Sequence, residues 1–133
     1  MTADVAATIL VVEDDPDVRK VATTQLGSLG YAIIEAEDAA SALDILRTDR
    51  PIDLLFTDVM MPGDMTGLDL GARALELRPG LMVLYTSGFT ETSLQDKEYV
   101  AAIPHNLITK PYRLRDLAQK VSEVLAANKK AGS

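Results

Sequence analysis

The sequence predicts a doubly wound α/β fold, in which helices cover both faces of a five-stranded parallel sheet. Short runs rich in Val, Ile and Leu alternate along the chain with segments whose apolar residues recur every three or four positions. Apolar runs without polar alternation are typical of strands buried on both faces, as in parallel sheets. Right-handed crossovers then leave few arrangements, of which the doubly wound one fits best.

The apolar patterns place the individual elements in chain order. The predicted strands cover 9–12, 31–36, 53–57, 81–85 and 106–109. The predicted helices cover 16–29, 39–46, 68–78, 91–103 and 114–125. The segment 91–103 has the poorest apolar face, whereas the last helix has the clearest apolar stripe.

Capping residues support the ends of the first two helices. Asp15 precedes Pro16, and this pair is typical of an N-cap followed by the first helical position. Gly30 follows the first helix, where a left-handed C-terminal cap favours glycine. Asp38 is the expected N-cap of the second helix.

Composition limits the class of protein. A chain of 133 residues with 47% hydrophobic and 25% charged residues matches a single globular domain. We expect no membrane span and no signal peptide, because no apolar stretch is long enough and Met1 is not followed by a basic and then an apolar region. The absence of cysteine excludes disulfides and thiolate metal sites, and fits a cytoplasmic location.

The net charge of −7 disfavours binding to nucleic acid, because no basic face offsets the repulsion of phosphates. Two interpretations of this charge stay open. The acids either provide general solubility, or several of them are gathered at one site.

Polar residues follow the predicted strands at the points where the apolar runs end. Glu13 and Asp14 follow the first strand, Asp58 the third, Thr86 the fourth and Lys110 the fifth. Because the carboxyl ends of parallel strands share one edge, we expect these side chains to converge there. Carboxylates, a hydroxyl and an ammonium together suit a divalent cation and a phosphoryl group.

The expected chemistry is the formation of an aspartyl phosphate on Asp58. Carboxylates on neighbouring strands, roughly 4.8 Å apart, would repel each other without a counter-ion. Mg²⁺ (or Mn²⁺) is usually held by one or two carboxylates together with phosphate oxygens. An ionised carboxylate is a competent nucleophile, while Lys110 and Thr86 could contact the phosphoryl oxygens.

Each of these polar residues also has a purely structural interpretation. A lysine at the end of a strand, such as Lys110, usually extends along the surface, and hydroxyls such as Thr86 mostly cap or turn. For Asp15 the N-cap interpretation is favoured, and His105 is interpreted as a loop residue. It is the combination of residue types at one edge that favours a phosphoryl site.

Together the motifs resemble the receiver domain of two-component response regulators. The resemblance rests on Val12–Asp15, Asp58–Pro62, Gly67, Thr86–Gly88 and Lys110–Tyr112. It implies the flavodoxin-like strand order 2-1-3-4-5 of the chemotaxis regulators. It extends over residues 8–126, so that 1–7 and 127–133 are expected to be flexible tails.

The resemblance also implies roles for the site residues. Asp58 is the phosphoacceptor, Thr86 the switch hydroxyl and Lys110 the lysine that contacts the phosphate. The implied ligands of Mg²⁺ are Glu13, Asp14, Asp58 and the backbone carbonyl of Met60.

The implied function is that of a phosphorylation-dependent switch. The phosphoryl donor is a phosphohistidine on a sensor histidine kinase or a histidine phosphotransfer protein, and the target is an unknown downstream protein. We expect a stand-alone receiver without nucleic-acid or membrane partners, which catalyses only its own phosphorylation and autodephosphorylation. The expected output surface lies around the fifth strand and its neighbouring helices.

Two features depart from the family pattern. Leu107 occupies the position where an aromatic residue usually accompanies the switch hydroxyl, and Phe89 or Tyr85 are the candidates to replace it. The loop from Asp58 to Gly67 is one residue longer than usual, with Thr66 where Asp is frequent. These departures are similar to receivers that belong to, or serve, hybrid sensor kinases.

Two rival functions are less consistent with the sequence. A magnesium-dependent phosphohydrolase typically carries a second Asp two residues after its nucleophile, and Met60 occupies that position. A flavin or nucleotide binder would need a glycine-rich loop after the first strand, where this chain has acids instead.

Overall fold

The structure is a computed structural model that describes residues 7–59, 65–87, 107–109 and 112–132. The strands are β1 (Thr8–Val12), β2 (Ala32–Ala36), β3 (Leu54–Asp58), β4 (Met82–Ser87) and β5 (Leu107–Thr109). The helices are α1 (Pro16–Ser28), α2 (Ala39–Leu46), α3 (Gly67–Leu77) and α5 (Leu114–Gly132). The predicted helix over 91–103 lies outside the described residues.

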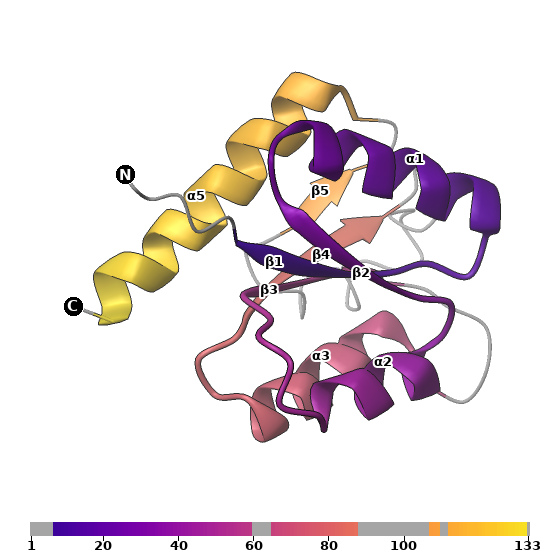
Figure 1. Cartoon of the computed structure of the whole chain (residues 1–133), viewed down its shortest axis with the longest axis vertical. Coiled ribbons are helices and arrows are strands. Elements are labelled where there is room, and N and C mark those ends of the chain that lie inside the picture. The colour runs from indigo at the N-terminus through magenta and orange to yellow at the C-terminus, as the bar shows by residue number, and fades with distance from the viewer. Residues whose placement is uncertain (1–6, 60–64, 88–106, 110–111, 133) are drawn as a thin grey trace, which may run out of the picture.

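The strands form one sheet in the order β2-β1-β3-β4-β5, and every neighbouring pair is parallel. Helices α1 and α5 lie on one face of the sheet, and α2 and α3 on the other (Figure 1). The predicted fold class and strand order are therefore confirmed. The order in which strands are added to the sheet reverses between β1 and β3, and sheets of this kind bind ligands at that point, outside the carboxyl ends of the strands.

The core consists of two layers, one on each side of the sheet. Alternate residues of β1 enter different layers: Leu10 and Val12 face α2 and α3, whereas Ile9 and Val11 face α1 and α5. All four of these side chains are at most 1% exposed. This two-sided burial explains why the strands have continuous apolar runs rather than alternating ones.

The predicted caps of the first two helices are confirmed. The side chain of Asp15 accepts hydrogen bonds from the backbone N–H groups of Asp17 and Val18, and Pro16 begins α1. Gly30, directly after the C-cap of α1, has a φ of 98°, a left-handed conformation that glycine adopts without a steric penalty. Asp38 caps α2 by accepting from the Ser41 N–H.

Two elements extend two or more residues past their predicted ends, and β3 ends one residue later than predicted, at Asp58. β4 continues to Ser87, because its pairing with β3 and β5 extends past Tyr85, so Thr86 lies inside the strand rather than after it. α5 continues to Gly132, beyond the apolar stripe that ends at Leu125. The domain limits at 8–126 and the flexible tails stay predictions.

The amino edge of the sheet is held by charged side chains that bind the backbone. Arg78, the C-cap of α3, donates from its guanidinium to the carbonyls of Leu46, Thr48 and Arg50 at 2.7–3.1 Å. These carbonyls belong to the end of α2 and the chain after it, which no longer have helical partners. One side chain therefore ties α3 to the end of α2.

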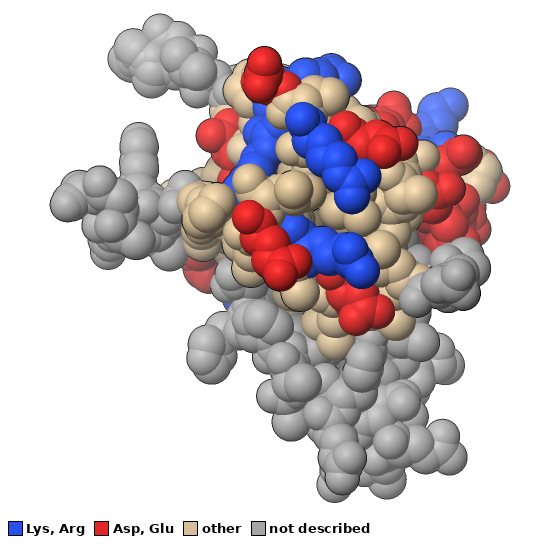
Figure 2. Space-filling view, turned by 90° about the horizontal axis from the view of Figure 1, so that it is seen from below, with Lys and Arg blue, Asp and Glu red and all other residues tan. Residues whose placement is uncertain are grey.

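The face formed by α2 and α3 carries charges of both signs, which are interspersed in Figure 2. Its exposed charged residues include Asp44, Arg47, Asp69, Arg73 and Glu76. Among the described helices, none is both long enough and apolar enough to cross a membrane.

Candidate phosphoryl site

The buried polar side chains at the carboxyl edge of the sheet include Glu13, Asp58 and Thr86. Glu13 is 7% exposed, Asp58 6% and Thr86 3%. Asp58 and Thr86 are register partners of β3 and β4, and Glu13 follows Val12, whose partner on β3 is Thr57. The three residues therefore occupy the ends of three neighbouring strands, roughly 4.8 Å from one strand to the next.

Asp58 and Thr86 also share one face of the sheet. Side chains alternate along a strand, and Phe56 and Leu84, two residues earlier, both pack in the layer beneath α1 and α5. By the same alternation Asp58 and Thr86 belong to that face. The register and the alternation together bring a carboxylate and a hydroxyl to the same place.

The backbone around Asp58 is fixed from both sides. The Val59 N–H donates to the Thr86 carbonyl, and the Gly67 N–H donates to the Val59 carbonyl, both at 2.8 Å. A Cβ atom added to Gly67 would overlap the carbonyl oxygen of Asp58. Gly67 is therefore required because the start of α3 packs directly on the backbone of Asp58.

The start of α3 is fixed by a capping box that was not predicted from the sequence. The Thr66 hydroxyl accepts from the Asp69 N–H and the Asp69 carboxylate accepts from the Thr66 N–H, both at 3.1 Å. A Thr followed three residues later by an acid is the signal that could have identified it. Thr66, in a position where Asp is frequent, thus has a clear structural role.

The loop after β1 carries the two other candidate acids. The Glu13 N–H donates to the Ala36 carbonyl at 3.2 Å, and the Glu13 carboxylate accepts from the Asp15 N–H at 3.2 Å. The Glu13 carbonyl accepts from the guanidinium of Arg19 at 2.7 Å. Asp14, between these anchored residues, is exposed.

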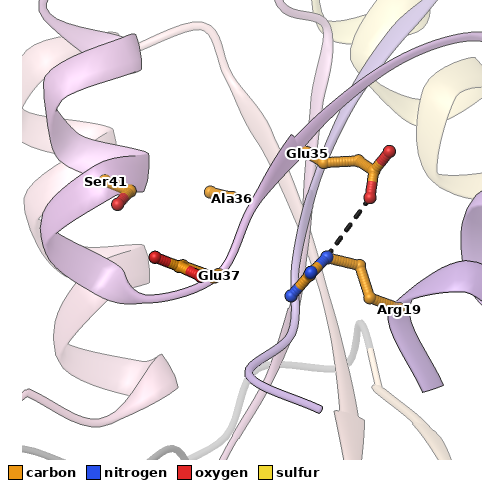
Figure 3. A pocket seen from close by; sticks show the side chains of 5 residues that line it. All are labelled: Arg19, Glu35, Ala36, Glu37 and Ser41. Carbon is orange, nitrogen blue, oxygen red and sulfur yellow. Dashed lines mark hydrogen bonds and ion pairs between the residues drawn. The ribbon is translucent and has the colours of Figure 1, made fainter. Parts of the chain in front are cut away.

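Arg19 was not identified from the sequence, because its contacts depend on the order of the strands. Its guanidinium also forms an ion pair with Glu35 of β2, at 3.2 Å between Nε and Oε1. Figure 3 shows the Arg19 side chain reaching from α1 to Glu35. Both side chains line a cavity of about 320 Å³, together with Ala36, Glu37 and Ser41.

Asp38, the N-cap of α2, directly follows Glu37, which lines this cavity. Hydrogen bonds from the backbone and the side chain of Ser41 lower the pKa of Asp38 below its ordinary value of 3.8. The cap is therefore strongest when this carboxyl group is ionised.

The end of β5 lies at the same carboxyl edge of the sheet. Ile108 is the register partner of Thr86, and Thr109 that of Ser87. Beyond Lys110 and Pro111, the ring of Tyr112 packs edge-on against Phe56 of β3, with centroids 6.4 Å apart. Lys110 and Met60 themselves lie outside the described residues, as do Phe89 and His105.

Tyr85 and Leu107 are register partners and belong to the layer on the α2 and α3 face. Tyr85 is 4% exposed, and a Cβ atom added to Gly71 would overlap its hydroxyl group. Tyr85, one of the two candidates to take the part of the aromatic residue that the family usually has at the position of Leu107, is thus buried between the sheet and α3.

The donor set suits Mg²⁺ better than a metal that needs many protein ligands. Among the described residues, no group of three or more His, Cys, Asp or Glu side chains is arranged to hold a metal ion. Mg²⁺ typically needs only one or two carboxylates and keeps several waters. Glu13 and Asp58, buried at neighbouring strand ends, can supply this number, whereas the three predicted carboxylates Glu13, Asp14 and Asp58 are not gathered into one ligand group in this structure.

Comparison with known proteins decides the family. The family model for the response regulator receiver domain matches residues 9–122, most of the chain. The chain belongs to this family.

Among similar proteins is the response regulator receiver protein CpdR of Brucella abortus (strain 2308), which is 34% identical over 90% of this chain and 97% of its own length. Sensor kinase CckA of the same organism is 31% identical over 90% of this chain, but the match covers 13% of CckA. A CheY-like receiver domain protein from Methanospirillum hungatei JF-1 has a solved structure that superposes with a TM-score of 0.81. It is 29% identical, and the match covers 96% of this chain and 99% of that one.

Proposed function

We propose that this receiver domain is a cytoplasmic, phosphorylation-dependent switch that accepts a phosphoryl group on Asp58 in the presence of Mg²⁺. The observation that carries the proposal is the burial of Asp58 at the end of the central strand, in register with Thr86 and next to the strand that ends at Glu13. Ligands of parallel sheets collect outside the carboxyl ends of the strands, and Asp58 lies at that edge.

The proposed reaction is a transfer from a phosphohistidine of a partner protein. An oxygen of Asp58 forms a bond to phosphorus while the bond between phosphorus and the imidazole nitrogen breaks, and the nitrogen keeps the electron pair. Glu13, Asp14, Asp58 and the Met60 carbonyl would hold Mg²⁺, which neutralises charge on the phosphoryl oxygens when bound. Hydrolysis of the resulting phosphoaspartate would return the switch to its resting state.

Thr86 and Lys110 complete the proposed site. Thr86 supplies a buried hydroxyl beside Asp58 that can donate to a phosphoryl oxygen. Lys110 follows a strand end next to β4, and Tyr112 anchors the chain after it on Phe56. These neighbours support an ammonium at the same edge.

The donor is proposed to be a sensor histidine kinase or a histidine phosphotransfer protein. The similarity to a segment of sensor kinase CckA supports this class of partner. The same similarity leaves two settings open, a receiver that serves a separate kinase and one that belongs to a hybrid kinase. The downstream target is proposed to be a protein.

Titration with Mg²⁺ tests the metal site. Wild-type protein should bind Mg²⁺, whereas the double variant Glu13→Gln with Asp14→Asn should bind it about 100-fold more weakly, since even groups that only support a ligand contribute about 10–100-fold. Isothermal titration calorimetry at constant ionic strength measures the difference.

The chain provides a matched control at the end of the neighbouring strand. Glu37→Gln with Asp38→Asn removes the same two charges at the same edge, and Asn is an equally good N-cap. Equal Mg²⁺ affinity in both double variants would contradict the assignment of Glu13 and Asp14.

A further inference from the structure

We infer that Arg19 is a positioning residue that fixes the backbone of Glu13 for the binding of Mg²⁺, and that Glu35 neutralises its charge. This inference deepens the proposed function and rests on it. It assigns a role to a residue that is not itself a proposed ligand of the metal.

The first support is the way in which Arg19 reaches the loop. Arg19 lies one turn into α1, where its N–H donates to the Asp15 carbonyl at 2.8 Å. Its side chain folds back toward the helix N-terminus, the usual direction for long side chains in helices. There the guanidinium donates to the carbonyl of Glu13 at 2.7 Å, a short, charge-assisted hydrogen bond.

The second support is the burial of this contact. The Arg19 side chain is 18% exposed, although arginine side chains are mostly exposed in proteins. The ion pair with Glu35 holds the guanidinium in place from the β2 side (Figure 3). α1, the loop after β1 and the end of β2 are thereby joined by one side chain.

The third support is electrostatic. A positive charge beside a cation site repels the cation, so an arginine there is unfavourable unless it is neutralised. Glu35 supplies the opposite charge while its own side chain stays 55% exposed and therefore well solvated. Arg19 can then hold the Glu13 backbone without opposing the binding of Mg²⁺.

The sign of a substitution effect separates positioning from charge. Arg19→Met removes a positive charge, which by charge alone should strengthen the binding of a cation. The positioning role predicts the opposite, about tenfold weaker binding, because the loop that carries Glu13 and Asp14 loses its anchor. Arg47→Met is the matched control: Arg47 is also paired with an acid, Asp44, but it is exposed and lies at the far end of α2.

The experiment measures Mg²⁺ affinity by calorimetry, together with the rate of phosphorylation by acetyl phosphate over a range of Mg²⁺ concentrations. Arg19→Met should need about tenfold more Mg²⁺ but reach the wild-type rate at saturation, and Arg47→Met should match the wild type in both. Arg19→Lys keeps the charge but loses the planar guanidinium that binds the Glu13 carbonyl and Glu35 at once, and its affinity should fall between those of Arg19→Met and the wild type.

If Arg19→Met binds Mg²⁺ as tightly as the wild type, or more tightly, this inference is wrong but the proposed metal site is not affected. If Arg19→Met does not fold, Arg19→Lys decides the question in the same way, since unchanged affinity there contradicts positioning by two hydrogen bonds. Wild-type protein that binds Mg²⁺ no better than Glu13→Gln with Asp14→Asn would instead overturn the proposed metal site, and this inference with it.

Discussion

The two edges of the sheet use charged side chains in opposite ways. At the amino edge, the exposed carboxylate of Asp53 accepts from the Thr8 N–H at 2.8 Å, and Arg78 binds three carbonyls. At the carboxyl edge, the carboxylates of Glu13 and Asp58 are buried at the ends of neighbouring strands.

This difference separates stability from function. Charged groups that remain solvated and bind the backbone hold loops together at a small cost in desolvation. Buried carboxylates are costlier to fold, because taking a charged group out of water costs free energy that its partners must offset. A fold retains such a cost where it serves a reaction, so the amino edge supports the structure and the carboxyl edge is proposed to support phosphorylation.

The largest effect is expected at Gly67. Gly67→Ala should lower the free energy of unfolding by about 3 kcal/mol, because its Cβ would overlap the backbone of Asp58, which cannot move aside as a flexible side chain could. Urea denaturation followed by circular dichroism measures this change.

Gly27 is the matched control, since nothing lies within 4 Å of a Cβ atom added there. Gly27→Ala on the surface of α1 should raise the free energy of unfolding by about 0.5–1 kcal/mol. If Gly67→Ala behaves like Gly27→Ala, the close packing of α3 on Asp58 is wrong.

A smaller effect is expected at the amino edge. Arg78→Met keeps the aliphatic stem but removes all three hydrogen bonds to the carbonyls of Leu46, Thr48 and Arg50. The free energy of unfolding should fall by about 2 kcal/mol, with water replacing part of the lost bonding.

Arg47→Met, which breaks an exposed ion pair, should change stability by less than about 0.5 kcal/mol in the same denaturation series. Equal losses in the two variants would show that Arg78 has no special part in holding the amino edge.

The sequence was sufficient where the signal was local. Continuous apolar runs identified the strands, and Asp15, Pro16, Gly30 and Asp38 marked helix ends that the structure confirms. The strand order came from the family resemblance and from the rules for crossovers, and the register then brings Asp58 to Thr86.

The sequence was insufficient where contacts depend on the assembled fold. Arg19 reaches Glu35 only because β2 lies beside β1. Arg78 binds the carbonyl of Arg50, which lies 28 positions earlier in the chain. No periodic pattern marks either arginine. The roles predicted for Lys110 and Met60 stay predictions, since both residues lie outside the described part of the chain.

The most direct test of the account is the intact mass of the protein after incubation with acetyl phosphate and Mg²⁺. Wild-type protein should gain the mass of one phosphoryl group, and Asp58→Asn should gain none, while Asp53→Asn should behave as the wild type. A phosphoryl adduct that persists in Asp58→Asn would show that the buried carboxylate of β3 is not the acceptor.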